Sequence, residues 1–164
     1  VPGDPGGFSL FGEAPADLRF FFEMLVRLAP DITTVRALCR ACEVRPSTLM
    51  SRFARAGLPS PKSYLASVRL LHAAHLLEAP GRSIADVAYR LEYSSPQSFG
   101  RHVRAMLGIT SLEFRRRFPF PAALARFLEL MIVPYRGVWP VFHPLETGSW
   151  DSGHCLAVQA PPPH

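Results

Sequence analysis

Three polar side chains recur at helical spacing in the segment SSPQSFGRHVR. Gln97, Arg101 and Arg104 fall on one face of a helix, and Phe99 and Val103 fall on another. An amide carries a donor beside an acceptor, and a guanidinium carries a fork of donors, so both can form paired hydrogen bonds with a flat polar group. The polar face therefore has the chemistry to bind base edges or phosphates. The alternative is a face that is only solvated.

A second copy of this pattern lies about fifty residues earlier in the chain. Each copy has a first helix, a turn of about four residues with a large apolar residue in it, and a second helix that opens with proline. The matching pairs are Cys39 and Ala88, Glu43 and Glu92, Val44 and Tyr93, Leu49 and Phe99, and Phe53 and Val103. This is the layout of a helix-turn-helix, in which the second helix lies in the major groove of DNA.

On this interpretation the polar side chains of the second copy bind different parts of a duplex. Gln97 can pair with adenine and Arg101 with guanine, while Gly100 between them allows the helix to approach the groove floor. The groups that suit phosphate oxygens are Arg104 and the amides near Ser94 and Ser95.

The basic residues are concentrated in the middle of the chain. The 164 residues carry a formal charge of +5, but residues 31–118 hold fourteen Lys or Arg against six Asp or Glu, a net +8. Seventeen of the eighteen basic residues are Arg, whose planar fork suits phosphate and guanine. A GC-rich genome would produce the same bias, so the excess of Arg leaves two explanations open.

The chain has the size of one domain with appendages, or at most two very small domains, and its 48% hydrophobic content suffices for a core. No apolar run approaches the roughly 18 residues of a membrane span, and the N-terminus lacks a charged and then apolar signal pattern. We expect a cytoplasmic, nucleoid-associated protein without a membrane partner.

The cysteine pattern favours a structural role, as small buried side chains, over metal binding or redox chemistry. Cys39 and Cys42 form a CxxC, but zinc would need two more ligands, and Cys155 lies far away in a Pro-rich segment. A redox CxxC normally opens a helix, whereas this one falls late in a helical pattern. We expect no metal, no cofactor and no enzymatic activity, although a reactive cysteine from a DNA-repair fusion is a third hypothesis.

Apolar periodicity predicts an all-α fold, with two helix-turn-helix subdomains joined by a long linker helix, plus a C-terminal helix and an irregular tail. The linker helix should run from about Pro61 to Glu78, and 18 residues at about 1.5 Å each span about 27 Å. When the thickness of the flanking helices is added, the length of the linker helix approaches the spacing of about 34 Å between adjacent major grooves. The expected helix starts are near Leu18, Thr34, Pro46, Pro61, Ser83, Ser95 and Thr110, and a last amphipathic helix carries Leu124, Phe127, Leu128, Met131 and Ile132.

The sequence resembles a known family at this point. The run SIADVAYRLEYSSPQSFGRHVRAMLGITSLEFR is similar to the second half of the DNA-binding domain of AraC/XylS-family bacterial transcription regulators. The run PSTLMSRFARAGLPSPKSYLASVRLLHAAHLLE is similar to the first recognition helix and linker helix of that domain. The resemblance implies a seven-helix bipartite fold, sequence-specific binding and promoter control, often as an activator that also touches RNA polymerase.

The resemblance also implies site residues in both copies. The base-facing positions of the first recognition helix hold Ser47, Met50 and Ser51, and those of the second hold Gln97, Gly100 and Arg101. Because Ser and Met offer little bidentate pairing, we expect the second helix to carry most base recognition. The first helix should act more through phosphates and DNA shape, with Arg45, Arg52 and Arg55 as candidates.

Several residues depart from the family pattern. Both turns hold Glu, at Glu43 and Glu92, where the family usually has Gly, and a positive φ at a residue with a side chain costs on the order of 1 kcal/mol. The usual closing Pro is replaced around Ser111, and Arg45 is a poor helix cap. Two carboxylates near DNA oppose binding, so the alternative function is a protein-interaction module with the same fold and a weakened DNA face.

Three regions follow from these patterns. We expect a flexible linker over residues 1–16, the double helix-turn-helix domain over 17–118, and an extension over 119–164 that ends in a Pro-rich tail. No sensor or receiver module fits into the first region, so the chain is either a stand-alone regulator or a fragment. It should bind one promoter site of about 20 base pairs as a monomer, since one chain holds both recognition helices.

Overall fold

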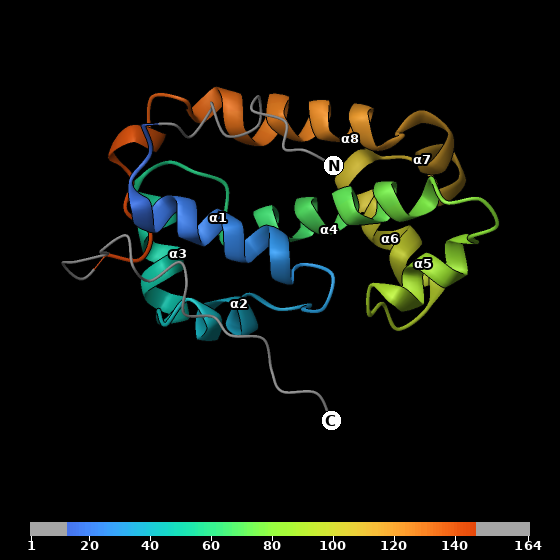
Figure 1. Cartoon of the computed structure of the whole chain (residues 1–164), viewed down its shortest axis with the longest axis horizontal. Coiled ribbons are helices and arrows are strands. Elements are labelled where there is room, and N and C mark those ends of the chain that lie inside the picture. The colour runs from blue at the N-terminus through green and yellow to red at the C-terminus, as the bar shows by residue number, and fades with distance from the viewer. Residues whose placement is uncertain (1–12, 147–164) are drawn as a thin grey trace.

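The computed structural model describes residues 13–146, and within this range every regular element is a helix (Figure 1). The all-α prediction is therefore confirmed. The elements are α1 (Ala16–Leu28), α2 (Val35–Ala41), α3 (Pro46–Arg55), α4 (Pro61–Leu77), α5 (Ile84–Arg90), α6 (Pro96–Leu107), α7 (Ser111–Arg117), α8 (Phe120–Phe127), a π-helical turn η2 (Leu128–Ile132), and the short 3₁₀ helices η3 (Val133–Tyr135) and η4 (Trp139–Val141).

Hydroxyl side chains cap the helices where the sequence predicts starts. Thr34 accepts a hydrogen bond from the Ala37 amide at 3.3 Å, and Ser95 accepts one from the Ser98 amide at 3.1 Å. Complete capping boxes open α5, with Ser83 and Asp86, and α7, with Thr110 and Glu113. Hydrogen bonds from the cap residues lower the pKa of both carboxyl groups in these boxes. Arg45 caps α3 without a side-chain bond, as expected of a poor cap.

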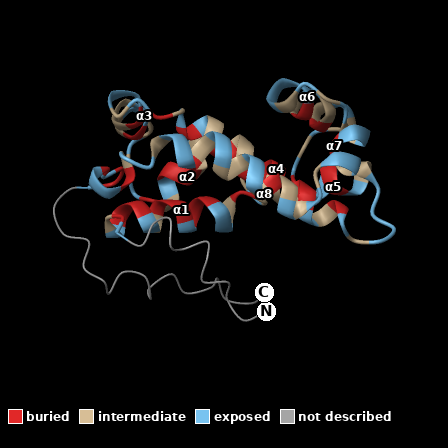
Figure 2. Ribbon diagram, turned by 90° about the horizontal axis from the view of Figure 1, so that it is seen from above, coloured by how far each residue is buried: buried red, intermediate tan, exposed pale blue. Residues whose placement is uncertain are grey.

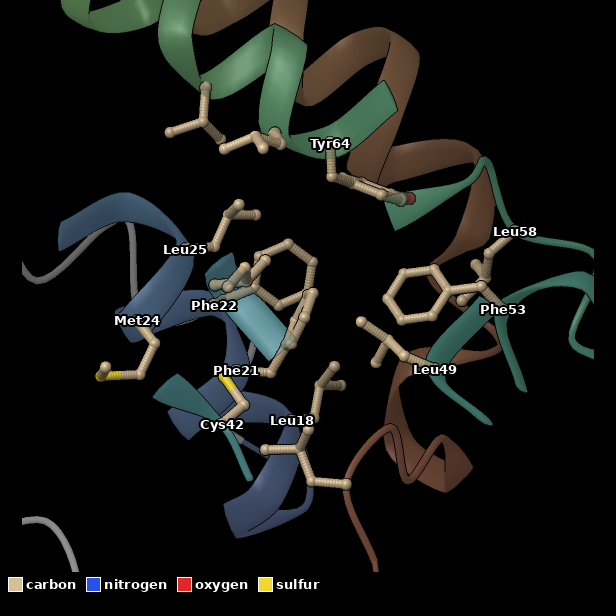
Figure 3. Packing of buried hydrophobic residues seen from close by; sticks show 14 of the residues in the cluster. Leu18, Phe21, Phe22, Met24, Leu25, Cys42, Leu49, Phe53, Leu58 and Tyr64 are labelled. Carbon is tan, nitrogen blue, oxygen red and sulfur yellow. The ribbon is translucent and has the colours of Figure 1, made fainter. Parts of the chain in front are cut away.

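Two hydrophobic cores lie at the two ends of the long helix α4. The first core joins α1, α2 and α3 and includes Phe21, Leu25, Leu49 and Phe53 (Figure 3). The second core joins α5, α6 and α7 around residues such as Phe99. Helix α4 contributes to both cores, with Tyr64, Leu65 and Val68 in the first and Leu70, Ala73, Ala74 and Leu77 in the second. Each helix-turn-helix therefore has a core of its own, and α4 joins them.

The buried surface of α4 is wider than the sequence predicts. Helical spacing predicts a buried stripe of Tyr64, Leu65, Val68, Leu71, Ala74 and His75 or Leu77. In the structure Leu70 and Ala73 are buried as well, whereas Leu71 is only half-buried and His75 is exposed. The reason is that the amphipathic segment of α8 and η2 lies along α4 (Figure 1), so α4 is covered on more than one side. The prediction that this segment covers the core of the domain itself is confirmed, since Ile132 is 1% exposed.

The segment after residue 132 differs from the irregular tail expected there. Trp139, Phe142 and Leu145 are all buried in the first core, and the Trp139 ring lies edge-on to Phe22 at 5.7 Å. The Leu145 amide donates to the buried carboxylate of Asp17 at 3.2 Å. This segment is thus part of the folded unit as far as residue 145. The expected linker up to residue 12 and the tail from residue 147 lie outside the described residues.

Both turns contain a strained glutamate. Glu43 has φ of 53° and Glu92 has φ of 61°, and these are the positive-φ residues other than glycine in the described part of the chain. Helix α6, by contrast, ends at Gly108 with φ of 69°, where no Cβ is present to clash. Both turns thus have the left-handed conformation that favours glycine, and each glutamate costs on the order of 1 kcal/mol there.

This strain leads to a prediction about Glu92. We expect Glu92→Gly to raise the free energy of unfolding by about 0.5–1 kcal/mol, because glycine adopts this φ without a steric penalty. Glu92→Ala is the matched control, since it removes the same charge but keeps the Cβ. Urea unfolding curves of the three proteins provide the measurement. Equal stability of the Gly and Ala variants would contradict strain at this residue.

Candidate nucleic-acid interface

The second helices of the two helix-turn-helix units, α3 and α6, lie at opposite ends of the molecule along the same edge (Figure 2). In each unit the first helix, α2 or α5, packs behind the second. The 17 residues of α4 separate the two units, which corresponds to about 25 Å of helix at 1.5 Å per residue. Both second helices therefore lie along one edge of the protein (Figure 2).

Helix α6 separates its residues as the sequence predicts. Phe99 and Val103 are fully buried, whereas Gln97, Arg101 and Arg104 are exposed. An open cleft of about 420 Å³ lies along the exposed face of α6. Its lining residues are Pro96, Gln97, Gly100, Arg101, Arg104, Thr110 and Ser111. The three polar side chains predicted on α6 thus lie together along one shallow cleft, with Ser94 and Ser95 at the start of the same helix.

Gly100 lines the cleft together with Gln97 and Arg101, and its predicted role in the approach to the groove floor stays a prediction. A Cβ at this position would lie 3.2 Å from Ser111 Oγ, which is closer than most side-chain contacts. The missing side chain therefore also leaves room for the Ser111 side chain at the start of α7. Thr110 and Ser111, at the start of α7, also line the cleft, which their place at a helix start does not indicate.

Helix α3 presents a less polar face. Leu49 and Phe53 are fully buried, while Ser47 is exposed and Met50 is 53% exposed. An exposed methionine on a recognition helix can contact the methyl group of thymine. Ser51 is half-buried, and its Oγ accepts a hydrogen bond from Arg55 Nη2 at 2.8 Å. This bond holds the exposed guanidinium of Arg55 along the helix.

Arg52 does not have the free guanidinium that was expected of a phosphate ligand. Its Nη1 donates to the carbonyl of Pro144 at 2.8 Å, and its Nη2 donates to the carbonyl of Glu146 at 2.9 Å. Arg52 instead fastens the C-terminal segment to α3. The sequence could not indicate this contact, because the partners are more than 90 residues away. Arg45 and Arg55 are exposed.

A buried polar network lies behind α6. The hydroxyl of Tyr93 is hydrogen-bonded to His102 Nδ1, and the guanidinium of Arg69 lies 4.6 Å from the centre of the Tyr93 ring. The Nε2 atom of His102 is buried without a hydrogen-bond partner among the described residues. Burial, together with the charge of Arg69, lowers the pKa of His102 to about 4.

The lowered pKa of His102 predicts a loss of stability in acid. The unfolded chain binds a proton at this residue below about pH 6.5, whereas the native protein does not until about pH 4. The free energy of unfolding should therefore fall as the pH drops from 6.5 to 4. Urea unfolding at pH 7 and pH 5 measures this fall, which should be smaller in His102→Gln. An equal fall in both proteins would contradict the assignment.

The cysteines are buried and free. Cys39 and Cys42 are 1% and 2% exposed, and burial raises the pKa of both thiols, for Cys42 to about 12 with a further contribution from Cys39. Both are therefore thiols at neutral pH and pack in the first core. Among residues 13–146, no group of three or more His, Cys, Asp or Glu side chains could hold a metal ion. Cys155 lies outside the described residues.

Within the described range, no single helix is long and apolar enough to cross a membrane. One pair of helical segments, Ser111–Arg117 and Phe120–Tyr135, has the length and apolar composition of a membrane span when the two are taken together, but the pair is bent by 98°.

Comparison with known proteins supports the assignment of the two units. A family model described as a helix-turn-helix domain matches residues 38–117, from α2 through α7. No curated protein and no solved structure matches the chain significantly. The matched range contains both recognition helices and the linker helix between them. Residues 38–117 therefore form a helix-turn-helix domain of the AraC/XylS type, which is the DNA-binding domain of a class of transcription regulators.

Proposed function

We propose that the protein binds a single duplex site of about 20 base pairs, with α3 and α6 in adjacent major grooves on one face of the DNA. The observation that carries this proposal is the placement of both helices on one edge of the molecule (Figure 2). The separation of about 25 Å along α4, with the thickness of the helices added, is compatible with one turn of B-DNA.

Base recognition is assigned mainly to α6. Gln97 pairs with adenine and Arg101, one helical turn further along, pairs with guanine, because both side chains are exposed and line the same cleft. On α3, Met50 contacts a thymine methyl group, and Ser47 and Ser51 add weaker polar contacts. Gly100 supports this surface by leaving room for the Ser111 side chain at the start of α7.

Phosphate contacts surround these positions. Arg104 lies one turn beyond the base-binding part of α6, and the amides near Ser94 and Ser95 lie at its N-terminus, where backbone N–H groups favour anions. On the other unit, Arg45 and Arg55 are exposed at the two ends of α3. Arg52 is excluded from this set because it is bonded to the C-terminal segment.

The cellular location, the oligomeric state on DNA and the mode of regulation are proposed on the basis of the family resemblance. We propose that the protein acts in the bacterial cytoplasm, in association with the nucleoid, as a monomer on promoter DNA. One chain holds both recognition helices, so DNA binding requires no second copy. Activation through contact with RNA polymerase is the mode we propose on the basis of the family resemblance.

The salt dependence of duplex binding tests this function. With the five phosphate contacts named above, the affinity for a genomic duplex should fall by roughly 500-fold between 50 and 200 mM salt, because bound counterions are released. The alternative function, a protein-interaction module, is favoured by the exposed carboxylates of Glu43 and Glu92 beside the DNA face. Binding of no duplex even at 50 mM salt would support that alternative and contradict the proposed function.

A further inference from the structure

Arg69 is a buried charge that bonds to both helix-turn-helix units. It lies in the middle of α4, is 5% exposed, and has no carboxylate oxygen within 4.0 Å among the described residues. Its Nη1 donates to the carbonyl of Ala29 at 3.1 Å and to that of Ile32. Its Nη2 donates to the carbonyl of Leu91 in the other unit.

These acceptors explain how the charge is tolerated inside the protein. Ala29 is the C-cap of α1 and Leu91 is the C-cap of α5, and helix C-termini carry partial negative charge. The aromatic face of Tyr93 adds a further negative surface at 4.6 Å. The positive charge is thus balanced by groups from both units, and a shift of either unit relative to α4 would break hydrogen bonds that compensate the buried charge.

The same contacts continue into the second recognition helix. The ring of Tyr93 lies against Arg69, and its hydroxyl is hydrogen-bonded to His102 Nδ1 on α6. Main-chain groups after α1, the side chain of Arg69 and the middle of α6 therefore form one connected network. A planar guanidinium with bonds in several directions fixes both distance and angle between its acceptors.

We propose that Arg69 is a positioning residue that fixes α6 relative to α3, and thereby sets the number of base pairs between the two halves of the DNA site. The spacing part of this inference rests on the proposed function. The geometric part does not, because the network exists in the protein without DNA.

The geometric part is tested by a distance measurement on free protein. Spin labels are attached to cysteines at the exposed residues Ala54 on α3 and Ala105 on α6, in a chain carrying Cys155→Ser. We expect a narrow distance distribution with Arg69 and a broadened or shifted one with Arg69→Gln, while Arg69→Lys should lie between them. The matched control is Asp31→Ala. It removes an exposed ion pair between the same two units, in which Asp31 Oδ1 lies 3.4 Å from Arg90 Nη1. This variant should keep the narrow distance distribution, because exposed ion pairs contribute little.

The spacing part is tested with duplexes that contain the protein's preferred site with one base pair inserted or removed between its halves. The parent protein should lose about tenfold or more in affinity on either change, because each base pair rotates one half-site relative to the other. Arg69→Gln should lose clearly less affinity on these altered duplexes than the parent protein does, because its two units can change their relative position.

The outcomes separate the inference from the function. An unchanged distance distribution in Arg69→Gln, or an undiminished spacing preference, would overturn the inference. Loss of helical circular dichroism in both Arg69 variants would also overturn it, because Arg69 would then be needed for the fold of the units. A parent protein without any preferred duplex would overturn the proposed function and the spacing claim, whatever the labels show.

Discussion

Replacing Trp139 with alanine is expected to lower the free energy of unfolding by about 3–5 kcal/mol, since it leaves a large cavity in the first core. The side chain is 2% exposed, and its ring packs edge-on against Phe22, Tyr64 and Phe142 at centroid distances of 5.7, 6.3 and 6.4 Å. Its Nε1 donates to the carbonyl of Ile132 at 2.9 Å. The loss would therefore disturb both the aromatic cluster and the end of the amphipathic segment.

Urea unfolding at pH 7 measures this effect, and Val141→Ala serves as the control in the same segment. Val141 is 74% exposed, so its replacement should change stability by less than about 0.5 kcal/mol. If Trp139→Ala were as stable as the control, the segment around Trp139 would not belong to the core.

Replacing Arg101 with alanine is expected to weaken binding to the preferred duplex by about 1–3 kcal/mol and to abolish the preference at one base pair. The guanidinium is exposed on α6 and lines the same cleft as Gln97. Duplexes that carry each of the four base pairs at the affected position provide the measurement. The variant should bind all four with similar affinity.

Arg104→Ala is the matched control for this prediction, because Arg104 lies on the same helix face one turn further along. Because Arg104 is proposed as a phosphate ligand, its replacement should weaken binding to every duplex equally. The slope of log affinity against log salt concentration should fall by about one released ion. If Arg101→Ala and Arg104→Ala lost the same fraction of affinity on all sequences, the assignment of Arg101 to bases would be wrong.

The elements with strong local signals could be predicted from the sequence. Caps such as Ser83 and Thr110 act within three residues, so the starts of α5 and α7 follow from neighbouring residues alone. The repeated pattern of Phe99 and Val103 likewise places the buried and exposed faces of α6. Even the strained turn at Glu92 follows from the pattern, because the turn geometry is fixed by the helices on each side.

The features that depend on distant contacts could not be predicted. The segment around Trp139 has no helical or strand periodicity, and only its packing against Phe22, more than a hundred residues away, shows that it is part of the core. Arg52 and Arg69 look like ordinary exposed arginines in the sequence. Their partners are carbonyl groups of the main chain, whose positions no residue type reveals.

The central claim is that α3 and α6 contact one side of a duplex in two adjacent grooves, and selection from a random duplex library tests it most directly. We expect the enriched sequences to contain two conserved blocks about one helical turn apart within about 20 base pairs, with the stronger block lost in Arg101→Ala. A single conserved block, two blocks on opposite sides of the DNA, or no enrichment at all would contradict the claim.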